Sequence, residues 1–293
     1  MDQAWRLRNM IQQQQTTKDH VAKVITITSG KGGVGKSNVS VNLAIQLSKL
    51  GKKVIILDAD FGFANVEVML GIRPKYSLYD LMFHNKTLEE IIVSGPENIS
   101  FISGGSGIRE LTTLTTEQVN YLNEKLYELD ESYDYIIIDT GAGMGESVIQ
   151  FATSSTKTIL VVTPEPTSIT DAYAVLKTLN HQEEFVNQGK KISMLTNRVS
   201  SYENGKELYQ KLNMVVSKFL QIEMEYLGPI NEDPNISKSV IQQKPISLAY
   251  PNSSATISMK RIAQALEDGA VTIPEQRYGL RQVFSNLIRS KRK

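Results

Sequence analysis

At 293 residues the chain is long enough for one large α/β domain with tails, and its 41% hydrophobic content is ample for a packed core. The formal net charge of +1 gives no overall bias towards nucleic acid, and the absence of cysteine excludes disulfides, cysteine-ligated zinc and iron–sulfur clusters. No apolar run approaches the roughly 18–20 residues of a membrane span, and the first residues contain no apolar signal-peptide core. We therefore expect a cytoplasmic protein.

The first twenty residues carry a short amphipathic pattern. Ala4, Leu7, Arg8 and Ile11 share one helical face, and the polar run Gln12–His20 that follows is typical of a linker. The pattern favours a partner-binding segment. A disordered start of the chain is the alternative.

Between residues 20 and 270, apolar runs alternate with helical patterns. This alternation predicts an α/β fold with a doubly wound, mostly parallel sheet and helices on both faces. The expected strands are residues 23–28, 53–57, 99–102, 135–138, 158–162, 191–195 and 225–227. The expected helices are residues 36–50, 116–129, 168–180, 205–220 and 253–266. We divide the chain into an N-terminal segment with its linker (1–20), one nucleotide-binding domain (21–272) and a C-terminal helix with a basic tail (273–293).

Residues 30–37 read Gly-Lys-Gly-Gly-Val-Gly-Lys-Ser, which is the spacing of a phosphate-binding P-loop. The loop lies between an expected strand and an expected helix, as this motif requires, and that context argues against a chance glycine-rich turn. The glycines let backbone amides point at a phosphate chain, and the amino end of the helix adds a favourable dipole. Lys36 supplies charge to the outer phosphates, and the Ser37 hydroxyl is placed to bind Mg²⁺.

Two apolar strands end in acidic residues. Residues 54–57 run into Asp58-Ala-Asp60, and residues 135–138 run into Asp139. Ligands of doubly wound folds lie outside the carboxyl ends of the strands, so both strands point carboxylates at the edge that carries the P-loop. Asp139 fits the position of a magnesium-binding acid. Capping of a turn or a helix is the alternative for each acid.

The C-terminus forms a second amphipathic pattern. From residue 277 to residue 293 there are six basic residues and no acid. The expected membrane-contacting residues are the apolar stripe and two of the cations, namely Leu280, Val283, Phe284, Leu287, Ile288, Arg277 and Arg281. An apolar face flanked by cations is typical of a helix at the surface of an anionic membrane. Packing of this helix on its own domain is the alternative, and the two can alternate with nucleotide state.

The second lysine of the P-loop, Lys31, makes it resemble the deviant Walker A motif of the MinD/ParA family of ATPases. The resemblance covers about residues 22–290 and implies ATP and Mg²⁺ as cofactors. It also implies that Lys31 reaches across a nucleotide-sandwich homodimer to the partner's ATP, as an arginine finger does. A solvated loop lysine is the alternative. The resemblance assigns phosphate binding to Gly30, Lys31, Gly32, Gly33, Val34, Gly35, Lys36, Ser37, Asn38 and Gly141.

The acidic strand ends resemble the two switch regions of that family. In switch I, the resemblance implies that Asp60 orients, or takes a proton from, the attacking water. Asp58 would lie nearer the magnesium shell, with Ser37 and Asp139 as the other metal-binding residues. Lys31, Lys36, Asp60 and Asp139 are thus the expected catalytic residues. Asn65 either positions switch I or caps a helix.

The adenine pocket is expected at the ends of two later strands. The resemblance places an adenine-contacting asparagine at Asn197, beside Arg198, because an amide can donate and accept along a base edge. It also places Pro229, Asp233 and Pro234 in a loop over the other side of the purine. A mere connecting loop is the alternative. The chain lacks the Asn-Lys-x-Asp guanine signature, which favours ATP over GTP.

The N-terminal segment resembles the motif that marks FlhG (YlxH), the flagellar branch of the MinD family. The matching positions are Asp2, Gln3, Ala4, Leu7 and Arg8. In that branch the segment stimulates the signal-recognition-type GTPase FlhF, and Gln3 would help to order the catalytic site of that GTPase. This resemblance covers only about the first eleven residues.

These features together predict a cytoplasmic switch ATPase that binds the inner face of the cell membrane and controls flagellar number and placement. The expected partners are FlhF, anionic lipid and cytoplasmic ring (C-ring) proteins of the flagellar base, with no nucleic acid. The alternatives are a division-site MinD ATPase, a ParA-type DNA-segregation ATPase and a nucleotide-binding scaffold without useful turnover. The intact Lys36, Asp60 and Asp139 argue against the scaffold.

Overall fold

The computed structural model describes residues 21–60, 65–105, 116–187, 192–269, 279–281 and 283–285. The predicted partner-binding residues Asp2, Gln3, Ala4, Leu7 and Arg8 lie outside these ranges, as do the predicted membrane residues Arg277, Leu287 and Ile288. Within the described ranges, no helix combines the length and the apolar character needed to cross a membrane.

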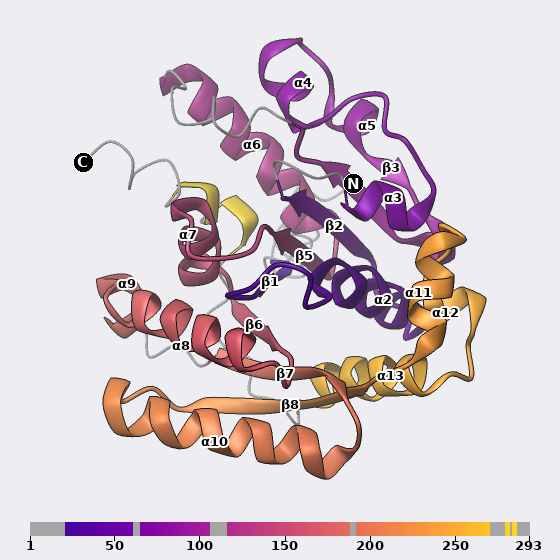
Figure 1. Cartoon of the computed structure of the whole chain (residues 1–293). Coiled ribbons are helices and arrows are strands. Elements are labelled where there is room, and N and C mark those ends of the chain that lie inside the picture. The colour runs from indigo at the N-terminus through magenta and orange to yellow at the C-terminus, as the bar shows by residue number, and fades with distance from the viewer. Residues whose placement is uncertain are drawn as a thin grey trace, which may run out of the picture.

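A single eight-stranded sheet runs through the centre of the described chain, in the order β3-β4-β2-β5-β1-β6-β7-β8 (Figure 1). Its strands are β1 (Lys23–Thr28), β2 (Val54–Ala59), β3 (Val93–Ser94), β4 (Ser100–Ser103), β5 (Tyr135–Thr140), β6 (Lys157–Val162), β7 (Ile192–Val199) and β8 (Met224–Asn231). All neighbouring strands are parallel except the β3–β4 pair. The predicted mostly parallel sheet is confirmed. Of the eight strands, only β3 was not predicted from the sequence, because its two residues are too few to leave a pattern.

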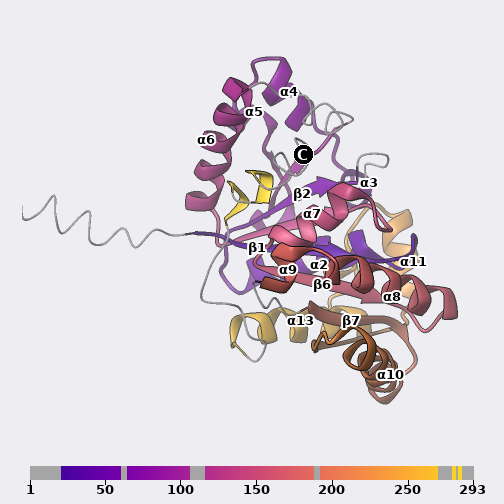
Figure 2. The same ribbon diagram turned by 90° about the vertical axis from the view of Figure 1, so that its left-hand side faces the viewer.

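Helices cover both faces of the sheet (Figures 1 and 2). They are α2 (Lys36–Lys49), α3 (Asn65–Leu70), α4 (Leu78–Phe83), α5 (Leu88–Ile91), α6 (Thr116–Ser132), α7 (Glu146–Ser154), α8 (Pro166–Asn180), α9 (Glu183–Asn187), α10 (Tyr202–Leu220), α11 (Pro234–Ile241), α12 (Ile246–Ala249) and α13 (Ser254–Glu267). One face packs against α2, α3 and α13, and the other against α6, α7, α8 and α10. Figure 2 shows α4, α5 and α6 at one end of the sheet and α10 at the opposite end.

Alternation along the buried strands explains the two layers. In β1, Val24 packs on one side of the sheet, whereas Ile25 and Ile27 pack on the other. The same pairing fixes the site, because the register of β2 and β5 places Asp58 directly beside Asp139. The strand ends therefore bring the two predicted acids together, as the sequence led us to expect.

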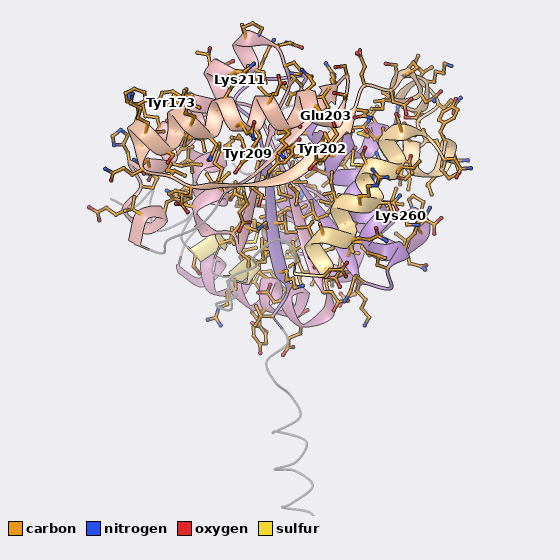
Figure 3. All side chains as sticks on the ribbon, turned by 90° about the horizontal axis from the view of Figure 1, so that it is seen from below. Tyr173, Tyr202, Glu203, Tyr209, Lys211 and Lys260 are labelled. Carbon is orange, nitrogen blue, oxygen red and sulfur yellow. The ribbon has the colours of Figure 1, made fainter. Side chains whose placement is uncertain are left out.

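The edge strand β8 is covered on both faces. Figure 3 shows α10, with Tyr209 and Lys211, on one side of β8 and α13, with Lys260, on the other. Tyr209 stacks on Tyr226 of β8 with ring centroids 4.8 Å apart, and the Tyr226 hydroxyl lies 2.9 Å from the Thr196 hydroxyl of β7. These contacts fix the end of β7, which carries Asn197.

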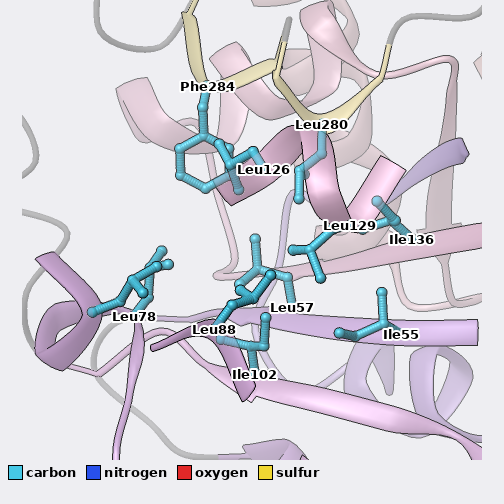
Figure 4. Close-up of a pocket in the computed structure, with 11 residues that line it drawn as sticks. Ile55, Leu57, Leu78, Leu88, Ile102, Leu126, Leu129, Ile136, Leu280 and Phe284 are labelled. Atoms are coloured by element: carbon cyan, nitrogen blue, oxygen red, sulfur yellow. The ribbon is translucent and has the colours of Figure 1, made fainter. Parts of the chain in front are cut away.

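The C-terminal segment, residues 279–281 and 283–285 in the described chain, packs against the face that carries α6 and α7. Leu280, Val283 and Phe284 are at most 1% exposed. Phe284 meets Phe151 of α7 edge to face, with ring centroids 5.6 Å apart. The eleven residues drawn in Figure 4 enclose a small cavity of about 10 Å³ beneath the segment, and all of them are apolar. Three of the predicted membrane residues are thus buried in the domain in this state.

Candidate nucleotide site

The P-loop joins β1 to α2 and begins the helix at Lys36. Gly35, the residue before the helix, has φ 98°, a left-handed conformation that favours glycine. The Lys36 side chain is buried, and its Nζ donates a hydrogen bond to Ser29 Oγ at 3.0 Å. Burial lowers the pKa of Lys36, whereas the nearby Asp139 and Asp60 oppose that shift. A buried cation at a helix amino end is suited to an anionic ligand.

Asp139 is completely buried at the end of β5. Its Oδ1 accepts a hydrogen bond from Ser40 Oγ at 2.8 Å, while its Oδ2 has no hydrogen-bond partner among the described residues. Burial raises the pKa of Asp139 to about 6, although the Ser37 and Ser40 hydroxyls lower it. An orphaned carboxylate oxygen beside a serine hydroxyl fits a bound Mg²⁺, because Mg²⁺ prefers oxygen ligands. Ser40 was missed in the sequence because a helical serine carries no signal of its own.

Asp58, also buried, holds the two ends of switch I. Its Oδ1 accepts a hydrogen bond from the Asp60 amide at 3.1 Å, and its Oδ2 accepts one from the Val66 amide at 3.2 Å. Burial, followed by the charge of Asp139, raises the pKa of Asp58 to about 8. The turn-capping alternative is therefore observed for Asp58, and its place in the magnesium shell stays a prediction.

Asp60 is half-buried and lies beside Gly141, two residues after Asp139. Its Oδ2 accepts a hydrogen bond from Asn65 Nδ2 at 3.0 Å, so Asn65 contacts the predicted catalytic carboxylate directly. Of the two roles considered for Asn65, this contact favours positioning of switch I. The structure thus brings Lys36, Asp60 and Asp139 to one edge of the sheet.

Lys31 turns away from these acids and contacts the start of α8. Its Nζ forms an ion pair with Glu165 and donates a hydrogen bond to Thr167 Oγ1 at 2.8 Å. The pair is partly exposed, and Lys31 lowers the pKa of Glu165. Glu165 and Thr167 had no motif to mark them, because they become neighbours of Lys31 only through the β6–α8 loop.

A cleft of about 930 Å³ extends from Lys36, Ser37 and Asp60 to the predicted base pocket. Asn197 and Arg198 line it, and both contact the P-loop: Asn197 Nδ2 donates to the Val34 carbonyl at 2.7 Å, and Arg198 donates to the Gly33 carbonyl at 2.8 Å. Asn197 Oδ1 is buried and has no partner among the described residues. It is therefore available to accept a hydrogen bond from a base.

The far wall of the cleft differs from the prediction. Pro229, Asp233 and Pro234 do not line it. Asp233 instead caps α11, accepting a hydrogen bond from the Asn235 amide at 2.9 Å. The wall is mostly apolar and includes Val68, Met69, Ile236, Val240, Ile241 and Met259, with Ser237 as a polar member. The sequence missed this wall because it is assembled from three helices, α3, α11 and α13, that lie far apart in the chain.

Comparisons with known proteins agree with this geometry. The AAA domain family matches residues 22–192. The antiactivator FleN of Pseudomonas aeruginosa is 38% identical over 248 residues, which cover 85% of this chain and 87% of FleN. The flagellum site-determining protein YlxH of Helicobacter pylori is 34% identical over 274 residues, or 91% of this chain and 90% of YlxH.

Solved structures show the same fold. The septum site-determining protein MinD of Pyrococcus horikoshii, solved with Mg-ADP, superposes with a TM-score of 0.66 at 26% identity and covers 87% of this chain and all of its own. That structure and the cleft described above identify ATP and Mg²⁺ as the ligands of this site. The chain therefore belongs to the MinD/ParA family of P-loop proteins and is a Mg²⁺-dependent ATPase.

Proposed function

We propose that this ATPase is a switch that regulates the number and placement of flagella. The observation that carries the proposal is the similarity to FleN and YlxH, which extends over most of each chain. The test is to delete the gene, restore either the wild type or Lys36→Gln, and count flagella and their positions by electron microscopy. We expect altered flagellation that only the wild type corrects. Unchanged flagella in the deletion strain would contradict the proposal.

In the proposed chemistry, the P-loop amides and Lys36 bind the phosphates, while Ser37 and Asp139 would hold Mg²⁺, which would supply positive charge against the phosphates. Asp60 orients the attacking water or accepts its proton, and Asn65 keeps the Asp60 carboxylate in place. The burial of the Lys36 cation at the P-loop and the unpartnered Asp139 Oδ2 support this assignment, because a phosphate and a metal ion are the ligands that these two groups favour.

The active form is proposed to be a homodimer with ATP between its subunits. Lys31 would then act on the partner's phosphates and stabilise charge on the transferring phosphoryl group. In the single chain Lys31 contacts Glu165 and Thr167, so it must leave them to do so. Light scattering with ATP and with ADP tests this step. A monomer under both conditions would contradict it.

The C-terminal segment is proposed to bind the inner face of the cell membrane. Leu280, Val283 and Phe284, with Leu287 and Ile288, would enter the lipid, and cations of the segment such as Arg281 would meet anionic headgroups. The complete burial of the first three supports an apolar face that needs a cover, either the domain or lipid. ATP-dependent sedimentation with anionic vesicles tests this. Equal binding with ATP and ADP would oppose nucleotide control.

The N-terminal segment is proposed to stimulate the GTPase FlhF. The test is GTP hydrolysis by purified FlhF with a peptide of residues 1–20, and the control is the same peptide with Gln3→Ala. Stimulation that the control lacks would support the flagellar assignment. No stimulation by either peptide would remove this partner.

Division-site placement is the second candidate function, because a MinD structure superposes on nearly the whole domain. Loss of septum placement, with normal flagella, in the deletion strain would favour it. A ParA-type role predicts binding to DNA that weakens with salt. Comparing DNA with anionic vesicles as ligands separates that role from membrane binding.

A further inference from the structure

Asp130, near the end of α6, contacts both ends of the folded domain. Its backbone carbonyl accepts a hydrogen bond from the Ala22 amide at 3.1 Å. Its carboxylate accepts hydrogen bonds from the Leu280 amide at 2.7 Å and the Arg281 amide at 3.3 Å. Ala22 is the residue before β1, where the N-terminal segment joins the domain, and the other two amides begin the C-terminal segment. Asp130 therefore contacts the residues at which both terminal segments join the domain.

The fit around Asp130 requires glycine at position 279. A Cβ on Gly279 would lie 2.2 Å from Asp130 Oδ2 and 2.7 Å from its Cγ. The glycine is needed because the carboxylate lies against it. A side chain at this position must displace either the carboxylate or the segment.

The electrostatics make Asp130 sensitive to docking of the segment. The residue is 4% exposed, and burial raises the pKa of its carboxyl to about 6 although the two amides lower it. An anion is disfavoured at the carboxyl end of its own helix, α6, and the Leu280 and Arg281 amides of the C-terminal segment offset this. The docked segment therefore stabilises Asp130 in its buried position. Undocking would expose the carboxylate to water and leave the end of α6 free to relax.

Ala22 and the segment also belong to one buried apolar cluster. This cluster contains Ala22, Leu280, Val283 and Phe284, and Ala22 is completely buried. Movement of the segment removes three apolar side chains from this cluster and two hydrogen-bond donors from Asp130.

We propose that Asp130 couples the two tails. Its carboxylate holds the amides of Leu280 and Arg281 in the C-terminal segment, and its carbonyl holds the amide of Ala22, which follows the N-terminal segment; we call these contacts the latch. Release of one tail then weakens the contact that holds the other. Only the purpose of this coupling rests on the proposed function: it would make partner binding by the N-terminus depend on membrane binding by the C-terminus. The coupling itself is a property of the single chain.

Hydrogen exchange on the full chain, without nucleotide, lipid or partner, tests the latch. Gly279→Ala should speed exchange of the Leu280 and Arg281 amides, and also of Ala22, by about tenfold, the factor expected for loss of a hydrogen bond. Asp130→Ala should do the same, whereas Asp130→Asn keeps one acceptor oxygen and should protect these amides better than Asp130→Ala. Arg281→Ala is the matched control, because it trims an exposed side chain of the segment and leaves the latch intact.

Faster exchange at Leu280 and Arg281 with unchanged Ala22 would overturn the coupling. No change at any of the three amides would overturn the latch. Faster exchange throughout β1 would mean that the domain had loosened, which also overturns it. Because the measurement contains no lipid, failure of the chain to bind vesicles would contradict the membrane proposal and leave this result standing.

Discussion

The nucleotide edge of the sheet and the face beneath the C-terminal segment are both buried, yet they consist of opposite kinds of side chain. At the edge, Lys36, Asp58 and Asp139 are buried ionisable groups held by hydroxyls and backbone amides. On the face beneath the C-terminal segment, which we call the docking face, every residue around the cavity is apolar. Buried charges require fixed geometry, whereas an apolar face accepts any apolar cover of suitable shape. The edge is thus suited to chemistry and the face to exchange of its cover.

The largest effect is expected from breaking the edge at Asp60. Asp60→Ala removes the group that orients the attacking water, so the ATP hydrolysis rate should fall roughly 10²- to 10⁴-fold. ATP binding should persist, because Lys36 and the P-loop are untouched. The measurements are phosphate release and nucleotide affinity. Normal hydrolysis by this variant would show that the catalytic assignment is wrong.

On the docking face, Phe284→Ala should leave chemistry alone and weaken docking. A buried Phe→Ala change costs roughly 3–5 kcal/mol, and here the loss falls on attachment of the segment. Hydrogen exchange at residues 283–285 should accelerate, with an unchanged ATPase rate per active site in the absence of lipid. The matched control is Phe219→Ala on α10, because Phe219 is 64% exposed. Equal protection in the two variants would contradict the docking that we describe.

The charged edge should also give the domain a distinctive pH dependence. The pKa of Asp58 is about 8 in the folded chain, well above its ordinary value, so the folded state binds this proton more tightly. The added stability is full at low pH and is lost as pH rises towards 8. Without nucleotide or Mg²⁺, Asp58 alone should lower the free energy of unfolding in urea by on the order of 3 kcal/mol between pH 5 and 8. Asp139 and Asp130, whose pKa values are raised to about 6, add to this fall. Asp58→Asn should make the curve less steep, and a flat wild-type curve would contradict the cause given for the shift.

A smaller effect at the edge is expected from Ser40→Ala. The Ser40 hydroxyl holds Asp139 Oδ1, and loss of such an outer contact typically weakens metal binding by roughly 10- to 100-fold. Titration of the ATPase rate with Mg²⁺ measures this. Ser48→Ala, on the same helix but bonded to the Glu97 carbonyl, is the control and should titrate like the wild type. Identical curves for all three proteins would remove Ser40 from the site.

The two regions also differ in how far the sequence predicts them. The P-loop, Asp60 and Asp139 follow from short motifs between elements of clear periodicity, and strand register then brings the acids together. Ser40, Glu165 and the apolar wall on α11 were missed, because their roles arise from contacts between segments far apart in the chain. On the docking face, the stripe of Leu280, Val283 and Phe284 was predictable. The sequence left its cover open between the domain and lipid, because an apolar helix face looks the same whether it meets protein or lipid.

The smallest effect is expected at a contact that shares one property with each of the two regions. The Lys31–Glu165 pair is charged, as at the edge, yet exposed and exchangeable, as on the docking face. Exposed ion pairs contribute little to stability, so Glu165→Gln should raise ATP-dependent dimer formation by no more than about fivefold. The reason is that Lys31 then leaves its own chain more easily. Analytical ultracentrifugation across protein concentrations measures the shift, with Glu90→Gln, which breaks the exposed Lys86–Glu90 pair, as the matched control. A weaker dimer in Glu165→Gln would mean that Glu165 supports the interface, and Lys31 would then be positioned for its partner by this contact rather than withheld by it.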